Sequence, residues 1–483
     1  MTHVDDCAGL DDDMRKVLPL MRSTSSPTTT ARRRRLTRLA LGATAAVAGA
    51  LPLALATAPS ATAAPSATAA PSANAAPSAN AAPLASPART AGAASHAHSA
   101  KSAAAPTAPP PVTILTAGSD RRGGDIFISP FGDPTTYANG AEIISPKGNV
   151  IWFHPAPSGQ EDADFRAQTY EGRKVLTFWQ GTGFGGLSTG TDYIFNDRFQ
   201  QIATVQAGNG LSADGHEFLI TPQNTALILS YTTATADLTA IGGPADQTVV
   251  NGVVQEIDIR TGRVLFQWNS ADHVPYSQSE QPLPASASTP WDWFHINAVH
   301  LTQDGNLLIN GRDTWTTYKI SRKTGAIIWQ LGGKDSDFTL RTAKGQVLDN
   351  AGEIFSWEHD PEQIGRNEFS FFDNDSAGTP NLPFSRVVVV RIDQRTKTAT
   401  LIRSYNQPEG MSAASQGNGQ PLRDGDVFVG WGALPFFSEF SKSGNLLFNA
   451  QFPAGVNTYR AYRLPWPGPG DGQQGRGRQH RRD

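Results

Sequence analysis

The stretch that decides the fold reads Val254-Gln-Glu-Ile-Asp-Ile-Arg-Thr-Gly-Arg-Val-Leu-Phe-Gln-Trp268. Two β-rich runs flank an Arg-Thr-Gly-Arg turn, which is typical of a β-hairpin because glycine in the turn permits a positive φ. The same hairpin returns at Tyr318-Lys-Ile-Ser-Arg-Lys-Thr-Gly-Ala-Ile-Ile-Trp329. Weaker copies lie at residues 142–153, 193–205, 388–405 and 437–452. The chain therefore contains six copies of one predicted hairpin.

A second kind of hairpin alternates with the first. Its clearest member runs from His295 to Arg312, and the others lie at residues 216–231, 359–374, 166–180 and 418–431, with 113–129 as the expected sixth. Two hairpins make a four-stranded sheet, and six such sheets at this spacing predict an all-β, six-bladed β-propeller over residues 112–466. We expect residues 458–464 to close the ring against the first blade. Two β-sandwiches are the alternative, but six alternating pairs are hard to divide between them.

The segment before this domain has the features of an export signal. Arg32, Arg33, Arg34, Arg35 and Arg38 precede an apolar run at 39–56, and Ala-Thr-Ala at 61–63 is a suitable cleavage site. We therefore expect residues 1–63 to be an N-terminal extension and secretory signal, and the protein to be secreted or extracytoplasmic, with cell-envelope association as one form of this. The arginines also resemble a twin-arginine signal. An uncleaved anchor is the alternative, whereas no cysteine follows the apolar run to carry a lipid anchor.

Two further segments have compositions that do not support a packed core. Residues 64–111 repeat Ala, Pro and Ser, and residues 467–483 are rich in Gly, Gln and Arg. We expect the first to be a disordered linker and the second a disordered tail.

Charge and cysteine content exclude several classes of function. Residues 112–483 carry 30 Lys and Arg against 38 Asp and Glu, and such an acidic balance disfavours a nucleic-acid partner. Nothing in this part is apolar for long enough to span a membrane. The only cysteine is Cys7, which precedes the signal, so cysteine catalysis and cysteine–zinc sites are excluded from the folded domain.

Three histidines occupy one position of the repeat. His216, His295 and His359 each open the first strand of a blade, and first strands line the central channel, so the three side chains should share one site at its mouth. Alternation places Asn297 on the face of His295, and Arg312 ends the partner strand. Such a set of donors suits an anion with several oxygens, such as sulfate, phosphate or carboxylate. Three histidines could instead bind zinc, but Arg312 would repel a dication.

These residues resemble those of bacterial arylsulfate sulfotransferases. The resemblance rests on Trp-Phe-His-Ile-Asn-Ala at 293–298 followed by Ile-Asn-Gly-Arg at 309–312, on His359 followed by Phe-Phe-Asp-Asn at 371–374, and on His216 opening its strand. It implies a six-bladed propeller that transfers a sulfuryl group from an aryl sulfate to a phenol without a phosphoadenosine-type donor or a cofactor. The reaction would pass through a covalent sulfohistidine with ping-pong kinetics.

The resemblance also implies roles for single residues. His359 matches the nucleophile, while His216, His295, Asn297 and Arg312 match the groups that hold the sulfuryl oxygens and handle the phenol proton. We also expect Asn297, Asn374 and Asn418 to bind the substrate. Glu358 and Asp360 flank His359, and neighbouring carboxylates raise the pKa of an imidazole, although alternation directs both side chains away from its face.

Two other functions stay open at the level of sequence. One is a non-catalytic secreted propeller that binds an anion or a metal at the cell surface. The other is a quinoprotein-like oxidoreductase, since residues 324–329 resemble the tryptophan-docking repeats of those propellers. Such enzymes need a carboxylate-rich calcium site, and the sequence offers no obvious one.

Overall fold

A computed structural model of the protein describes residues 106–118, 124–183, 187–377 and 380–466. The predicted signal at 1–63, the linker up to residue 105 and the tail at 467–483 lie outside the described residues. Within them the chain forms strands and four short 3-10 helices, and no helix there is long and apolar enough to cross a membrane. The all-β fold class is confirmed.

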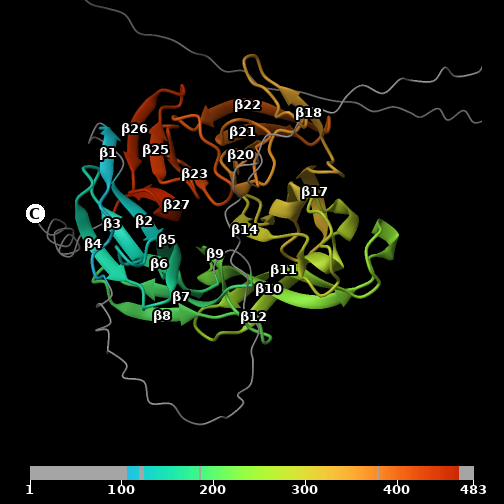
Figure 1. Ribbon diagram of the computed structural model, residues 1–483, viewed down its shortest axis with the longest axis horizontal. Coiled ribbons are helices and arrows are strands. Elements are labelled where there is room, and N and C mark those ends of the chain that lie inside the picture. Colours follow the sequence, from blue (N-terminus) through green and yellow to red (C-terminus); the bar gives the residue numbers. More distant parts are fainter. Residues whose placement is uncertain (1–105, 119–123, 184–186, 378–379, 467–483) are drawn as a thin grey trace, which may run out of the picture. The chain divides into compact units, whose positions relative to one another are not determined.

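The strands form six sheets, which are arranged as the blades of a propeller around a central axis (Figure 1). From the axis outward, the first three blades are β27 (Asn457–Leu464), β2 (Asp125–Phe131), β3 (Gly140–Ile144), β4 (Val150–Pro155); β5 (Glu161–Tyr170), β6 (Arg173–Thr182), β7 (Thr189–Phe195), β8 (Gln201–Val205); and β9 (Asp214–Ile220), β10 (Thr225–Ala236), β11 (Gln247–Asp258), β12 (Val264–Asn269). The other three are β14 (Ile296–Leu301), β15 (Leu307–Gly311), β16 (Thr316–Ile320), β17 (Ile327–Gly332); β19 (His359–Gln363), β20 (Glu368–Asp373), β21 (Arg386–Asp393), β22 (Thr398–Asn406), β18 (Thr339–Thr342); and β23 (Asn418–Pro421), β24 (Val427–Gly430), β25 (Phe436–Phe440), β26 (Leu446–Gln451), β1 (Thr113–Thr116). The short β13 (Trp291–Asp292) adds to the third blade beside β11.

The predicted hairpins correspond to these strands. All six copies of the first hairpin are found as the third and fourth strands of the blades, counted from the axis, such as β11 with β12 and β16 with β17. The glycines of these turns have the positive φ that the sequence predicted, 70° at Gly262 and 76° at Gly325. Five of the second hairpins are the inner pairs of their blades, including β9 with β10, β14 with β15 and β19 with β20.

The ring is closed by strands from both ends of the folded part. β27 pairs antiparallel with β2, so the expectation that residues 458–464 close the ring against the first blade is confirmed. At the other end, β1 pairs with β26 in the last blade. The prediction that residues 113–129 form the sixth inner hairpin is therefore wrong. β1 and β2 belong to different sheets, because β27 already occupies the inner edge of β2.

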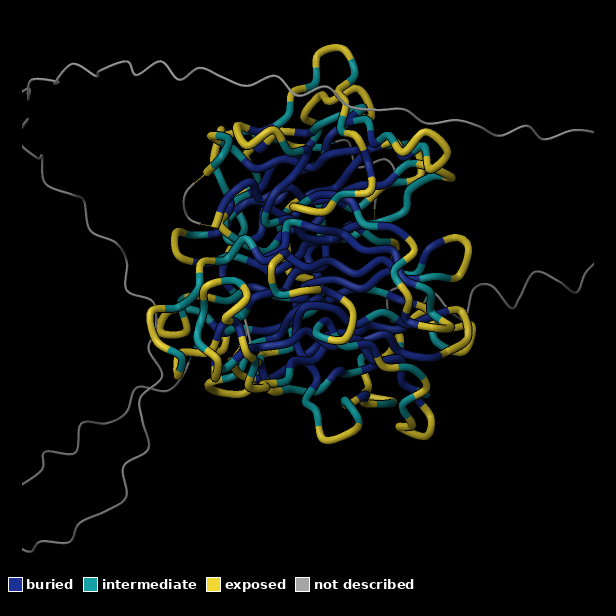
Figure 2. Tube along the Cα trace, turned by 90° about the vertical axis from the view of Figure 1, so that its right-hand side faces the viewer, coloured by how far each residue is buried: buried dark blue, intermediate teal, exposed yellow. Residues whose placement is uncertain are grey.

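Apolar side chains fill the spaces between neighbouring blades. Trp268 at the end of β12 and Trp329 in β17 are both 1% exposed, in separate clusters on successive blades. The indole of Trp268 also donates to the carbonyl of Gly325 in the next blade at 3.1 Å. Figure 2 shows buried strands through the interior and exposed turns at the periphery. This rigid packing fixes the inner strands, which carry the site.

Candidate active site

The three predicted histidines meet at one end of the inner strands. His216 is the third residue of β9, His295 directly precedes β14, and His359 opens β19. The rings of His216 and His295 make an edge-to-face contact with centroids 5.2 Å apart. Tyr459 of β27 links the group, because its ring centroid lies 5.5 Å from that of His216 and 6.5 Å from that of His359. Sequence reasoning did not select this tyrosine, which the closing strand brings to the site.

The tautomer of His359 is fixed by Asn374. The amide nitrogen of Asn374 donates to the carbonyls of Ala413 and Gln416, each at 3.0 Å, so its oxygen must be the atom 2.7 Å from Nδ1 of His359. That oxygen can only accept, and Nδ1 therefore carries the proton. The other ring nitrogen, Nε2, accepts a hydrogen bond from the main-chain N–H of Gln416 at 3.1 Å. The lone pair of His359 is thus on Nε2.

His359 is neutral in this environment. Burial, together with the positive charge of Arg312, holds the pKa of its imidazole well below the ordinary value of 6.5. The expectation that Glu358 and Asp360 raise this pKa is wrong. Burial raises the pKa of Glu358 well above its ordinary value and so favours the uncharged carboxyl, and Asp360 interacts with His300 and Arg460 on the axis.

The other two histidines are held by carboxylates. Nδ1 of His216 lies 2.5 Å from Asp214, and Nδ1 of His295 lies 2.6 Å from Asp292. Each aspartate also accepts the main-chain N–H of its histidine at 3.0 Å. The site therefore contains two His–Asp pairs and one His–Asn pair, and the three histidines are chemically unequal.

The carboxylates around His295 raise the pKa of its imidazole. Burial alone would lower the pKa of its imidazole, but the negative charges of Asp292 and Asp313 outweigh that effect and raise the pKa above 6.5. His295 also has a left-handed φ of 47°. A backbone strained at a non-glycine residue is often found at a functional position.

Arg312 lies beside both His295 and His359. Its main-chain N–H donates to the carbonyl of His295 at 3.1 Å, and its guanidinium donates to Asp313 at 2.6 Å and to the carbonyl of Ala414 at 3.2 Å. Its side chain is 11% exposed. The structure thus brings the predicted arginine to the histidine cluster.

The predicted asparagines mainly join blades. The amide of Asn297 donates to the carbonyl of Glu358 at 2.8 Å and accepts from Asn310 at 3.0 Å. The side-chain amide of Asn418 donates to the carbonyl of Ala461 at 2.9 Å and accepts from its main-chain N–H at 3.0 Å, so it pairs with the strand as another peptide group would. Contact of these residues and of Asn374 with a substrate stays a prediction.

A buried ionic network fills the axis next to the histidines, and it was missed from sequence. Arg460 of β27 donates to Glu217 at 2.8 Å and lies 3.6 Å from Asp360. Nε2 of His300 lies 3.1 Å from Glu217 and 3.4 Å from Asp360. Arg166 of β5 pairs with Glu217 as well. One signal was present, since an acid directly follows both His216 and His359 in the sequence.

The charges of this network stabilise one another. Burial alone would lower the pKa of His300, but Glu217 and Asp360 raise it to about 10. Burial would likewise raise the pKa of Glu217, yet Arg460, His300 and Arg166 hold it well below its ordinary value. Both groups are therefore ionised at neutral pH.

Two groups among the described residues have ligand atoms close enough for a metal ion: Glu217, His300 and Asp360 on the axis, and Asp292, His295 and Asp313 at the mouth. Each group includes a carboxylate that already pairs with an arginine, Glu217 with Arg460 and Asp313 with Arg312. In the described part of the chain, the three site histidines are not a group of this kind. The residues at the mouth therefore suit the binding of an anion better than the binding of a metal ion.

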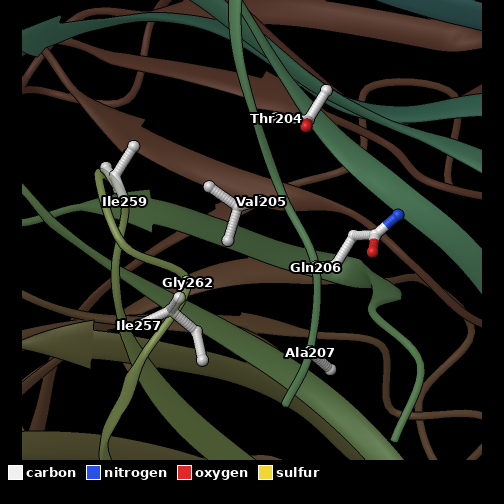
Figure 3. A pocket seen from close by; sticks show the side chains of 7 residues that line it. All are labelled: Thr204, Val205, Gln206, Ala207, Ile257, Ile259 and Gly262. Carbon is white, nitrogen blue, oxygen red and sulfur yellow. The ribbon is translucent and has the colours of Figure 1, made fainter.

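Two surface cavities lie away from the histidines. One of about 270 Å³ is lined by residues such as Val205, Ile257 and Gly262, between the second and third blades (Figure 3). The other, of about 570 Å³, lies beside the Pro109–Pro111 stretch and Glu142. No predicted site residue lines either cavity.

Comparison with known proteins adds a family match. The sequence pattern of the family described as Arylsulfotransferase (ASST) matches residues 166–453, more than half of the chain. No curated protein matches the sequence significantly. Among solved structures, a Bacteroides caccae protein of unknown function is similar at 12% identity and a TM-score of 0.40, covering 71% of this chain and all of that one. Virginiamycin B lyase from Staphylococcus aureus, with quinupristin, is similar at 9% identity and a TM-score of 0.35, covering 71% of this chain and 88% of that one.

Proposed function

Because the chain belongs to the arylsulfotransferase family and is an aryl sulfotransferase, we propose that it moves a sulfuryl group from an aryl sulfate ester to a phenolic acceptor through a sulfohistidine at His359. The donor would be the ester itself, with no phosphoadenosine-type cosubstrate. One observation carries this proposal: His359 alone is held by a neutral amide, with its lone pair on Nε2 and its pKa lowered. A neutral imidazole has a lone pair with which it can act as a nucleophile at neutral pH.

In the first half-reaction, Nε2 of His359 attacks the sulfur, and the bond from sulfur to the aryl oxygen breaks. The electron pair of that bond leaves with the phenolate, which takes a proton from the imidazolium of His295. The raised pKa of His295 supports this role, because a general acid must be protonated at the working pH. His359 keeps its Nδ1 proton throughout, and the oxygen of Asn374 stabilises the positive ring that results.

The second half-reaction reverses these steps with a new phenol. Neutral His295 takes the proton of the acceptor hydroxyl, the phenolic oxygen attacks sulfur, and the N–S bond of His359 breaks. The donor phenol must leave before the acceptor binds, which predicts ping-pong kinetics. Arg312, with His216 and Asn297, would stabilise the charge on the sulfuryl oxygens, since donors fixed in place before reaction act on charge that develops in the transition state.

The Gln416 N–H has a part in this scheme. In the free enzyme this N–H donates to the lone pair on Nε2 of His359. The aryl sulfate must therefore displace the N–H before Nε2 can attack sulfur. A freed main-chain N–H at this place is well positioned to donate to a sulfuryl oxygen.

The test uses p-nitrophenyl sulfate with and without phenol. Without acceptor we expect a burst of one nitrophenolate per enzyme and a mass gain of one sulfuryl on the peptide that contains His359. His359→Ala should abolish both, whereas His273→Ala, at an exposed histidine stacked on Trp268, should keep both. No burst and no mass gain in the wild-type protein would reject the proposed sulfohistidine at His359.

We also propose that the protein is exported, because basic residues, an apolar run and a small-residue cleavage site follow one another at residues 32–63. Secretion or attachment to the cell envelope would agree with this. Cell fractionation together with N-terminal sequencing of the mature chain tests it. Replacing Arg33 and Arg34 with lysine should block export only if the twin-arginine route is used.

A further inference from the structure

Two half-buried tryptophans extend the site outward from Arg312. The guanidinium of Arg312 lies 5.0 Å from the ring centroid of Trp357, and the ring of Trp357 makes an edge-to-face contact with Trp315 at 5.2 Å. Trp315 caps the 3-10 helix that begins at Arg312, and Trp357 stands two residues before His359. The pair therefore lies at the same end of the ring as the histidines.

Both tryptophans have an unfavourable backbone. The φ of Trp315 is 49° and that of Trp357 is 57°, a left-handed conformation that a bulky side chain rarely adopts. Such strain persists where a side chain must point in a set direction, and it gathers at ligand sites. In addition, the indole N–H of Trp315 is buried and has no hydrogen-bond partner among the described residues. The φ of Trp315 is that of a helix C-cap, and buried indole N–H groups without a partner also occur at Trp291, Trp329 and Trp466. The positive φ of Trp357, which ends no helix among the described residues, is therefore the more informative feature.

We propose that Trp315 and Trp357 form the wall on which the aryl ring of the substrate stacks, with its sulfuryl group directed to Arg312 and His359. The proposal deepens the function argued above and rests on it. An indole face attracts an aromatic ring through offset or edge-to-face contact. The positive charge of Arg312 beside Trp357 suits the anionic end of the same molecule. The wall would thus select aryl over alkyl sulfates.

Binding of stable analogues tests the wall without turnover. In a sulfonate the sulfur is bonded to carbon, so naphthalene-2-sulfonate and methanesulfonate bind without reacting. By calorimetry, we expect the wild-type protein to prefer the naphthalene compound. Trp315→Asn and Trp357→Asn should weaken it by about 5- to 10-fold and leave methanesulfonate unchanged. Asparagine tolerates a positive φ, so these variants should keep the backbone.

Two further variants control the measurement. Trp152→Asn removes a half-buried tryptophan from the outer strand β4 and should leave the binding of both compounds unchanged. Trp357→Phe retains an aromatic face and should keep most of the affinity, which provides a second readout if an asparagine variant does not fold. Equal weakening of both sulfonates, or no weakening of either, would overturn the wall.

The outcomes separate this proposal from the reaction. Preference for the naphthalene compound that depends on both tryptophans, without sulfuryl transfer to His359, would keep the wall and reject the proposed reaction. Sulfuryl transfer to His359, together with unchanged binding of both sulfonates in the tryptophan variants, would keep the proposed reaction and reject the wall.

Discussion

The side-chain oxygen of Asn374 lies 2.7 Å from Nδ1 of His359, and the amide nitrogen of Asn374 is committed to two carbonyls. This contact sets the tautomer of the proposed nucleophile, whereas burial and the charge of Arg312 lower its pKa and keep the imidazole neutral. An aspartate at position 374 would convert the His–Asn pair into a His–Asp pair like those of His216 and His295. The difference between nucleophile and proton carrier would then be lost.

The first prediction concerns Asn374→Asp. A carboxylate at Nδ1 should raise the pKa of His359, so less of the imidazole is neutral at pH 7 and the acid limb of kcat/KM should move up by about one pH unit or more. The measurement is a pH–rate profile with p-nitrophenyl sulfate. Asn449→Asp is the matched control, because that buried amide lies in β26 and bonds the side chains of Ser438 and Glu409 instead of a site histidine. A shift of the same size in both variants would contradict the assignment.

The second prediction concerns Asp292→Asn. This change removes the carboxylate that does most to raise the pKa of His295, so the pKa should fall by about one unit. Donor cleavage needs His295 protonated, and the basic limb of the burst rate should therefore move to lower pH. Asp272→Asn, at an exposed aspartate, should leave the profile in place. An unchanged basic limb in Asp292→Asn would assign the proton to another group.

The third prediction concerns the stability given by the axial network. Arg460→Met would leave Glu217 and Asp360 buried without their guanidinium, which should lower the free energy of unfolding by about 3–5 kcal/mol. Arg391→Met removes an exposed partner of Glu368 at 2.8 Å and should cost about 0–1 kcal/mol. Urea denaturation measures both. Equal losses would show that the burial of Arg460 has no energetic consequence.

The fourth prediction concerns the pH dependence of stability. His300 has a folded pKa of about 10 against an ordinary value of 6.5, so its contribution is fully present below pH 6.5 and is lost as pH rises toward 10. The free energy of unfolding of the wild type should fall over this window. His300→Gln cannot titrate, and its curve should be flatter there. If the free energies of unfolding of the wild type and of His300→Gln had the same pH dependence, His300 would not be the group that titrates in this window.

The repeat predicted most of the fold and the place of the histidines. Glycine turns fix hairpin register, and register brings His216, His295 and His359 to one end of the ring although they are far apart in sequence. The error at residues 113–129 has a physical cause. In a closed ring either end of the chain can supply the missing strand, and local sequence does not say which sheet edge β1 will join.

The chemistry of the site was harder to predict. Asp214 and Asp292 stand two and three residues before their histidines, so a local pattern existed for those pairs. The partners of His300 come from β9 and β19 across the axis, and alternation says which way a side chain faces without saying what it meets. The lowered pKa of His359 depends on burial and on Arg312 from another blade, which no neighbouring residue reveals.

The pairing of β27 with β2 has a consequence for the order of events during synthesis. β27 is the last strand of the folded part, yet it supplies Tyr459 between the histidines and Arg460 on the axis. The other five blades can form while the first blade still lacks its inner strand. Activity should therefore switch on in a single late step, and a chain released before residue 457 should be inert although it contains every proposed catalytic group.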